Sequence, residues 1–215
     1  MGLRAVLVED DTLMRRMLAN ALRSRGISVV AEYATATDAV TMDSAIQPNV
    51  AILDLHLGKG PTGLDVAQSL RRRNPNIGIV FLTSFDDPRL LNPNLPSLPG
   101  NSQYLTKSKL EDIDSLIQAM TDAAVGRPSS ASPTLDKNPL EDFTDVQLET
   151  LRLVAQGFSN AEIAKRRFVT ERSVEISISR IARVLGLSAD ATRNQRVHMA
   201  RVYFRALGRS PIDEE

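Results

Sequence analysis

Five polar residues stand where short apolar runs of the sequence end. They are Glu9 and Asp10 after residues 5–8, Asp54 after residues 50–53, Thr83 after residues 77–82, and Lys107 after residues 104–106. Clustered carboxylates repel one another unless a cation joins them, and oxygen ligands in this number suit a hard ion such as Mg²⁺. A carboxylate can also act as a nucleophile and form an aspartyl-phosphate. An ammonium and a hydroxyl would then hold the phosphoryl oxygens by charge and hydrogen bonds.

The elements that must position these residues alternate between strands and helices. Apolar runs at 5–8, 27–31, 50–53, 77–82 and 104–106 predict strands, and helical spacing at 13–22, 65–73 and 110–125 predicts helices. Alternating strands and helices predict a parallel, doubly wound α/β sheet. Because functional groups in such sheets gather beyond the carboxyl ends of the strands, we expect the five residues to share one site.

The composition predicts an ordinary soluble protein. The chain has 215 residues, of which 42% are hydrophobic and 24% are charged, enough for one large or two small domains. The absence of cysteine excludes disulfides and thiolate metal sites. The sequence has no start typical of a signal peptide and no apolar stretch of membrane-spanning length, so we expect a cytoplasmic protein.

A segment rich in small, polar and proline residues divides the chain. We expect residues 1–125 to form the first domain, residues 126–141 a flexible linker and residues 142–215 the second domain. The formal net charge of zero hides an asymmetry. Residues 158–209 carry 11 lysines and arginines against 4 acids, a net +7, whereas residues 1–125 carry 12 against 14, a net −2. The basic segment is of the kind that meets phosphates.

The second domain is predicted to be all helical. Thr144 with Gln147 and Ser159 with Glu162 have capping-box spacing. Gly157 is placed to end the first helix. Thr170 can cap a helix that runs to about residue 185, and a last helix covers about residues 192–207.

The helix after Thr170 has one apolar face and one basic face. Val174, Ile178, Ile181 and Leu185 share the apolar face, which predicts a core stripe. The opposite face presents Arg172, Ile176, Ser179, Arg180 and Arg183, with Glu175 at its edge. An outward isoleucine among arginines fits contact with a thymine methyl, while the arginines fit phosphate or guanine.

The first domain resembles a receiver domain of the two-component response regulators. The resemblance rests on Val-Glu-Asp-Asp at residues 8–11, Ile-Leu-Asp-Leu around Asp54, Phe-Leu-Thr-Ser around Thr83 and Tyr-Leu-Thr-Lys ending at Lys107. It implies a flavodoxin-like sheet of order 2-1-3-4-5, with Asp54 as the phosphoacceptor and a histidine kinase as the phosphodonor. It also implies a Mg²⁺ site made by Asp10, Asp54 and the backbone carbonyl of His56, supported by Glu9. Thr83 and Tyr104 would form the switch pair.

Residues 143–190 resemble the LuxR-type helix-turn-helix of NarL/FixJ-type response regulators. The matching stretches are residues 148–157, 159–164, 171–174 and 185–187. The resemblance implies binding of double-stranded DNA at an inverted repeat by a homodimer. The residues expected at the DNA are Ser159, Asn160, Thr170, Arg172, Ser173, Glu175, Ile176, Ser179, Arg180 and Arg183.

Three features depart from these families. The loop after Asp54 is one residue longer than usual and has Gly58 where a proline is common. Pro88, Pro93, Pro96 and Pro99 occupy the place of the usual fourth receiver helix, and a proline inside a helix costs about 3 kcal/mol. We therefore expect a loop or a single turn near residues 89–91, either as a neutral surface loop or as a changed output face.

The third departure is Glu175, where the family often carries lysine. Its carboxylate would either accept a hydrogen bond from cytosine or lower non-specific affinity. The last helix has Val197, Ala200, Phe204 and Leu207 at helical spacing, for core packing or for a dimer contact.

We therefore expect a transcriptional regulator, not an enzyme, that is switched by phosphorylation of Asp54. One alternative is a phosphorylation-independent DNA-binding regulator whose first domain senses a ligand or a metal. An alternative from another class is an aspartyl-phosphate phosphotransferase, which would need a further substrate-binding domain.

Overall fold

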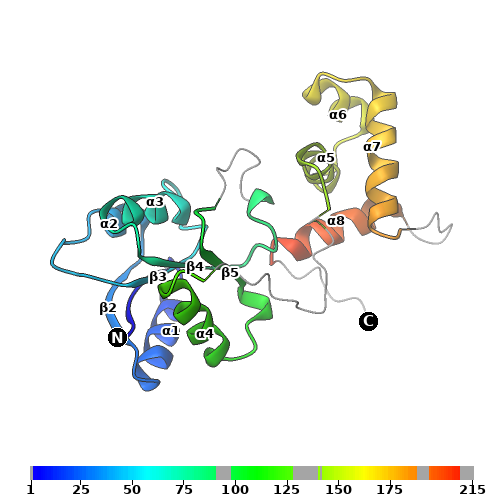
Figure 1. The fold of residues 1–215 in the computed structure, drawn as a ribbon. Coiled ribbons are helices and arrows are strands. Elements are labelled where there is room, and N and C mark those ends of the chain that lie inside the picture. Colours follow the sequence, from blue (N-terminus) through cyan, green and yellow to red (C-terminus); the bar gives the residue numbers. More distant parts are fainter. Residues whose placement is uncertain (1, 91–97, 128–139, 141, 188–193, 209–215) are drawn as a thin grey trace. The chain divides into compact units, whose positions relative to one another are not determined.

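The computed structural model describes residues 2–90, 98–127, 140, 142–187 and 194–208. These residues form two compact units (Figure 1). The first contains residues 2–84 and 98–127, and the second contains residues 85–90 together with the described part of 140–208. Within the described residues, no helix has the length and apolar character needed to cross a membrane.

The first unit is built on a five-stranded parallel sheet. Its strands are β1 (Arg4–Val8), β2 (Ser28–Tyr33), β3 (Val50–Leu53), β4 (Gly78–Thr83) and β5 (Ser102–Thr106), in the order β2-β1-β3-β4-β5. This order confirms the predicted flavodoxin-like topology. Every residue of β3 and β4 is buried, as expected for parallel strands covered on both faces.

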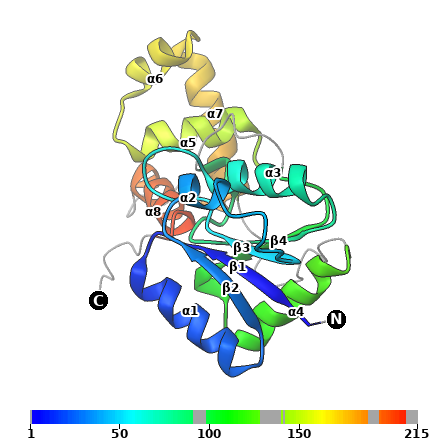
Figure 2. The same ribbon diagram turned by 90° about the vertical axis from the view of Figure 1, so that its left-hand side faces the viewer.

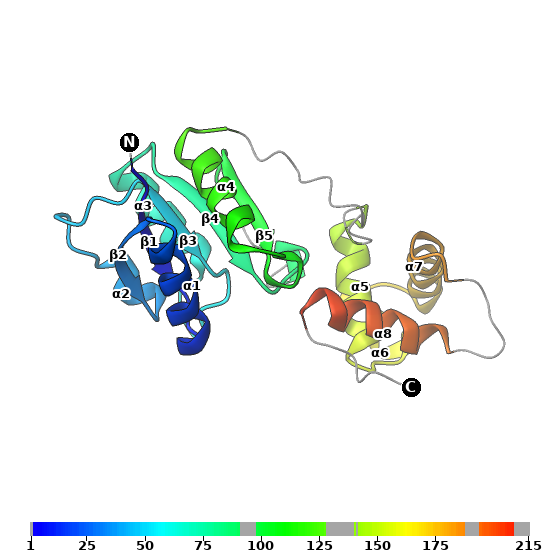
Figure 3. The same ribbon diagram turned by 90° about the horizontal axis from the view of Figure 1, so that it is seen from below.

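Helices cover both faces of this sheet (Figures 1 and 2). Helices α1 (Thr12–Ser24) and α4 (Ile113–Ala124) lie side by side on one face, and α2 (Ala36–Val40) and α3 (Gly63–Arg73) lie on the other. Figure 3 shows α1 and α4 in front of the strands. The helix α2, only one turn long, was not among the predicted elements, and a short 3₁₀ turn, η2 (Lys107–Lys109), precedes α4.

Local capping explains where the helices of the first unit begin. The side chain of Asp11 accepts from the amide of Met14 at the start of α1. Thr62 and Asp65 exchange hydrogen bonds in a capping box at the start of α3. Because each cap satisfies amides that have no partner within the helix, it fixes the point at which the loop after a strand turns into a helix.

The second unit contains four α-helices among its described residues. They are α5 (Asp145–Ala155), α6 (Asn160–Arg167), α7 (Glu171–Val184) and α8 (Gln195–Ala206). Thr144 caps α5 in a complete capping box, and Ser159 and Thr170 cap α6 and α7, as predicted. Gly157, with φ of 85°, follows the C-cap of α5.

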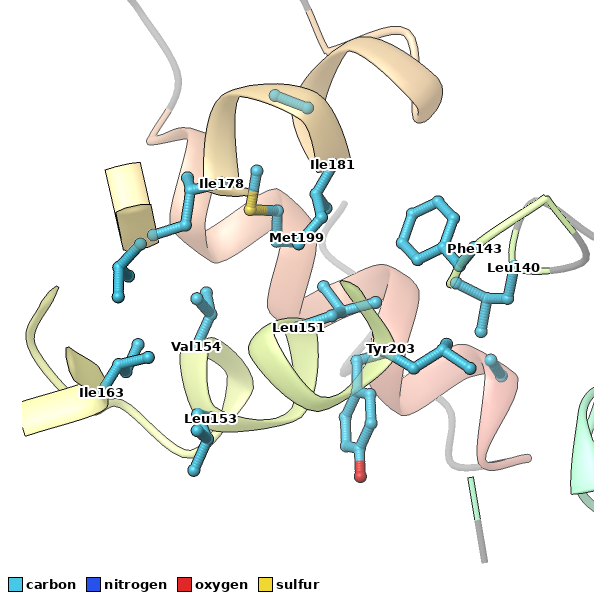
Figure 4. Close-up of a cluster of buried hydrophobic side chains, with 14 of the residues drawn as sticks. Leu140, Phe143, Leu151, Leu153, Val154, Ile163, Ile178, Ile181, Met199 and Tyr203 are labelled. Atoms are coloured by element: carbon cyan, nitrogen blue, oxygen red, sulfur yellow. The ribbon is translucent and has the colours of Figure 1, made fainter. Parts of the chain in front are cut away.

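The core of the second unit lies between these helices (Figure 4). Val174 and Ile181 of α7 are fully buried and Ile178 nearly so, which confirms the predicted apolar stripe. The stripe predicted for α8, for core packing or for a dimer contact, packs against the core only in part, through Phe204 and Leu207. The buried residues of α8 are Met199, Tyr203 and Ala206, whereas Val197 is 49% exposed, because the helix packs on α5 through a different face.

The part of the proline-rich segment that the structure describes begins with a 3₁₀ turn, η1 (Pro88–Leu90). This agrees with the single turn predicted near residues 89–91. Pro93 and Pro96 lie outside the described residues. Asp87 and Leu90 are buried within the second unit, so residues 85–90 are not a neutral surface loop.

Candidate functional site

The carboxyl ends of β1 and β3 bring three carboxylates together in the first unit. One oxygen from each of Glu9, Asp10 and Asp54 lies within 4.8 Å of the others. The amide of Asp54 donates to the carbonyl of Val8, so the sheet register sets the spacing of the acids. Glu9 and Asp54 are 2% and 5% exposed, whereas Asp10 is exposed. The group is thus sealed on one side and open to solvent on the other.

Lys107 links two of these carboxylates. Its Nζ lies 2.6 Å from Oδ2 of Asp54 and 2.7 Å from Oε2 of Glu9. The residue follows β5 directly and is the first residue of η2. The single ammonium faces three carboxylates, so the described site has an excess of negative charge.

Burial and the neighbouring charges shift the pKa values of Glu9 and Lys107. Burial raises the pKa of the Glu9 carboxyl, and the hydrogen bond and charge of Lys107 offset only part of this effect. Burial acts to lower the pKa of the Lys107 ammonium, but the carboxylates of Asp54 and Glu9 together raise it. A further cation beside Glu9 would favour its ionised form. Three carboxylate oxygens with one open side are a donor set that could hold a metal ion.

Two backbone features fix the Asp54 carboxylate. The amide of His56 donates to Oδ1 of Asp54 over 3.1 Å, while the His56 side chain is exposed. Gly63, the first residue of α3, packs against the Asp54 backbone so closely that a Cβ at this position would lie 2.0 Å from the Asp54 carbonyl oxygen. Nothing local in the sequence distinguishes Gly63 from the glycines of the neighbouring loop, so its role could not be predicted.

Thr83 and Tyr104 lie on adjacent strands. Thr83 is fully buried at the end of β4, and its register partner on β5 is Thr106. Tyr104 stands two residues before Thr106 and is half-buried. Because side chains alternate along a strand, Thr83 and Tyr104 are diagonal neighbours on the same face of the sheet.

In the second unit, α7 presents a continuous exposed face. Six of the residues predicted for DNA contact line one open groove along it: Arg172, Glu175, Ile176, Ser179, Arg180 and Arg183. Ile176 is 42% exposed, although it sits among charged side chains. The Nη1 of Arg172 lies 3.0 Å from Oε2 of Glu175, so these two groups neutralise each other in part.

The other four residues predicted for DNA contact lie at helix N-termini. The hydroxyls of Ser159 and Thr170 accept amide hydrogen bonds as helix caps, and Ser173 lies 2.9 Å from Thr170 through their hydroxyl oxygens. The amide oxygen of Asn160 accepts from Nη1 of Arg196 over 2.8 Å. Arg196 therefore orients the start of α6 from α8, a relationship that spacing in the sequence does not reveal.

A buried polar chain ties the helices behind the groove. Arg167 of α6 donates to the hydroxyl of Thr150 on α5 over 2.6 Å, and Ser177 of α7 donates to the same hydroxyl over 3.3 Å. Thr150 is fully buried and Ser177 is 9% exposed. These bonds hold α7 at a defined position relative to α5 and α6.

Comparison with known families assigns both units. The response regulator receiver domain matches residues 5–120, and the luxR family of bacterial regulatory proteins matches residues 141–201. The chain is 29% identical over 194 residues to a nitrate/nitrite response regulator protein homolog of Haemophilus influenzae, covering 86% of this chain and 91% of the relative. It is 28% identical over 197 residues to the DNA-binding transcriptional activator DevR/DosR of Mycobacterium tuberculosis, covering 86% and 88%.

Solved structures share the fold. A structure described as the two-component response regulator RcsB–DNA complex matches with a TM-score of 0.60 at 18% identity, covering 96% of this chain and 100% of that one. A structure of RcsB dimers bound to DNA matches with a TM-score of 0.58 at 20% identity, covering 96% and 100%. At this identity the likeness concerns the fold alone.

Proposed function

Because the chain belongs to the two-component response regulators, with a receiver domain followed by a LuxR-type DNA-binding domain, we propose that phosphorylation of Asp54 controls its binding to DNA. The observation that carries this proposal is the group of Glu9, Asp10 and Asp54, whose carboxylate oxygens lie within 4.8 Å of one another, with Lys107 bound to Glu9 and Asp54. The curated relatives are DNA-binding transcription regulators and not enzymes. The phosphotransferase alternative therefore has no support from them.

The phosphodonor is a histidine kinase. A carboxylate oxygen of Asp54 forms a bond to phosphorus while the phosphorus–nitrogen bond of the kinase phosphohistidine breaks, and the leaving nitrogen keeps its electron pair and takes up a proton. Lys107 already lies within hydrogen-bonding distance of Asp54 and would hold a phosphoryl oxygen. Thr83 would hold another, and its rearrangement together with Tyr104 would report the event.

The metal is Mg²⁺. Asp10, Asp54 and the backbone carbonyl of His56 would hold it, with Glu9 in support, since hard cations prefer oxygen ligands. When bound, Mg²⁺ supplies positive charge that neutralises the incoming phosphoryl oxygens. The three carboxylate oxygens that Glu9, Asp10 and Asp54 hold within 4.8 Å of one another support this assignment.

The DNA is read by α7. Its exposed groove places Ile176 between Glu175 and the three arginines 172, 180 and 183, which suits a helix that lies in the major groove. Ser159, Asn160, Thr170 and Ser173 would contact the backbone of the duplex at the helix N-termini, where amide groups favour phosphate. We propose that the active form is a homodimer on an inverted repeat, because two copies of one helix read two symmetric half-sites.

Intact mass spectrometry tests the phosphoacceptor. Incubation of the full chain with acetyl phosphate and Mg²⁺ should add the mass of one phosphoryl group, and Asp54→Ala should stay unmodified. An unmodified wild type would favour the phosphorylation-independent sensor. Turnover of a small phosphoester by the wild type would favour the phosphotransferase.

A further inference from the structure

The unit that contains the DNA-binding helices also contains residues 85–90, which come from the middle of the receiver sequence. This segment follows β4 closely: β4 ends at Thr83, and the segment begins after a single intervening residue, Ser84. Its last three residues form the 3₁₀ turn η1 (Pro88–Leu90). The stretch directly after a pocket residue is thus part of the DNA-binding unit.

The segment is anchored at the end of α8 and in the core. The amide of Asp86 donates to the carbonyl of Ala206 over 2.8 Å. Ala206 is the last residue of α8, where backbone carbonyls receive no hydrogen bond from within the helix. Leu90 is 8% exposed and is a member of the hydrophobic core of the second unit, and Phe85 packs against the same core.

Arg89 anchors the segment to the entrance of α5. Its Nη1 donates to the carbonyl of Phe143 over 2.7 Å and its Nη2 to the carbonyl of Leu140 over 3.0 Å. The buried carboxylate of Asp87 binds the same guanidinium, with Nη2 at 2.7 Å. Phe143 stands directly before Thr144, the cap of α5. The guanidinium therefore fixes the turn from which α5 begins.

The surface that receives the segment is formed by α5 and α8. Arg89 and Leu90 line a small, mostly filled cavity together with Leu148, Glu149 and Arg152 of α5 and Tyr203 of α8. Tyr203 itself is 7% exposed and belongs to the core. Displacement of the segment would therefore uncover core residues of two helices at once.

We propose that residues 85–90 transmit the state of the phosphorylation pocket to the DNA-binding unit, with Arg89 as the positioning residue. This inference rests on the proposed function. Thr83 is fully buried at the end of β4, and a single residue separates it from the segment, so a rearrangement of Thr83 can reach residue 85 along the backbone. Because the segment is hydrogen-bonded to Ala206 and Phe143, a movement of its backbone would change the positions that α8 and α5 prefer. An equilibrium between two conformations of the DNA-binding unit shifts when the segment contacts one of them more favourably than the other.

The test compares DNA affinity with and without phosphate on Asp54 in the full chain. The wild type should show a phosphorylation-dependent ratio of dissociation constants. Arg89→Ala should accept phosphate to the wild-type level by intact mass, yet its ratio should fall toward one. Arg89→Lys, which keeps the charge and part of the hydrogen bonding, should restore part of the ratio.

Val154→Ala controls for simple destabilisation. Val154 is a buried residue of α5 that belongs to the same hydrophobic core as Ile163 (Figure 4). The Val154→Ala variant should change the DNA affinities of the phosphorylated and unphosphorylated forms alike, so the ratio of their dissociation constants should stay as in the wild type. The proposal is overturned if Arg89→Ala keeps the wild-type ratio, or if Val154→Ala loses it to the same extent. A wild type that takes no phosphate, or binds no DNA, marks instead a failure of the proposed function.

Amide hydrogen exchange checks the docking without any phosphodonor. The amide of Asp86 should exchange as slowly as the amides of α8, and faster in Arg89→Ala. Exchange at the rate of an open loop in the wild type would also overturn the proposal. On phosphorylation, the exchange rate at Asp86 and Leu90 should change.

Discussion

The ammonium of Lys107 lies 2.6 Å from Oδ2 of Asp54 and also binds Glu9, so one cation joins two buried carboxylates. In the structure Lys107 is a cation shared by these two buried acids. We propose that it also holds a phosphoryl group on Asp54.

Lys107→Ala should destabilise the metal-free receiver. Loss of one partner of a buried ion pair typically costs about 3 kcal/mol, and protonation of Glu9 would recover part of it. Thermal unfolding in EDTA measures the loss. The exposed Lys109, two residues further on, supplies the control Lys109→Ala, and an equal effect of the two changes would contradict this role for Lys107.

Mg²⁺ should stabilise the wild-type receiver against unfolding. A ligand at a hundred times its dissociation constant adds about 2.7 kcal/mol. Asp10→Asn should abolish most of this gain, because it removes the exposed carboxylate of the three. Glu111→Gln, at an exposed acid outside the group, should leave the gain intact. A gain that survives Asp10→Asn would place the metal elsewhere.

Gly63→Ala should distort the phosphorylation pocket. The new methyl would lie 2.0 Å from the carbonyl oxygen of Asp54, so α3 and the loop after β3 must separate. Overpacking of this kind typically costs about 1–3 kcal/mol. We expect a lower unfolding temperature and slower labelling by acetyl phosphate. Gly100→Ala is the matched control, since a Cβ there meets no atom within 4 Å. Wild-type labelling in Gly63→Ala would show that the contact is dispensable.

Arg180 and Ile176 should contribute differently to DNA binding. Arg180→Ala should weaken binding to all sequences and make the dependence on salt shallower by about one counterion, because it removes a phosphate contact. Ile176→Ala should change sequence preference instead. Binding titrations at several salt concentrations separate the two. Arg205→Ala, at an exposed arginine of α8, controls for net charge, and no loss in Arg180→Ala would exclude this docking of α7.

Glu175 should limit non-specific affinity through its contact with Arg172, whose Nη1 lies 3.0 Å away. Glu175→Gln removes the negative charge and leaves Arg172 available to phosphate, so affinity should rise on unrelated sequences. A selective loss at one base position, with unrelated sequences unaffected, would instead support a hydrogen bond from cytosine to Glu175.

The sheet and the position of its site were predictable because buried strands produce a recognisable pattern of apolar residues in the sequence. Strands β3 and β4 are buried on both faces and read as unbroken apolar runs, so the residues that follow them, Asp54 and Thr83, could be placed at one edge. Long-range contacts leave no such pattern. Gly63 against Asp54 and Arg196 on Asn160 depend on the tertiary fold alone.

The docking of residues 85–90 was the largest feature beyond reach of the sequence. The prolines exclude a regular helix, but they do not say where the segment packs. In α8, apolar residues occur on more than one side, so periodicity favoured a stripe through Val197 although Met199 and Tyr203 are the buried residues. The element was predictable, but the face it buries was not.

The most direct test of phosphorylation control starts with selection of binding sites from a random DNA pool, followed by titration of the selected site with full-length protein. Wild type treated with acetyl phosphate and Mg²⁺ should bind it with a dissociation constant clearly different from that of untreated protein, and Asp54→Ala should show no such change. Equal affinities for treated and untreated wild type, with Asp54 carrying phosphate by intact mass, would contradict the account.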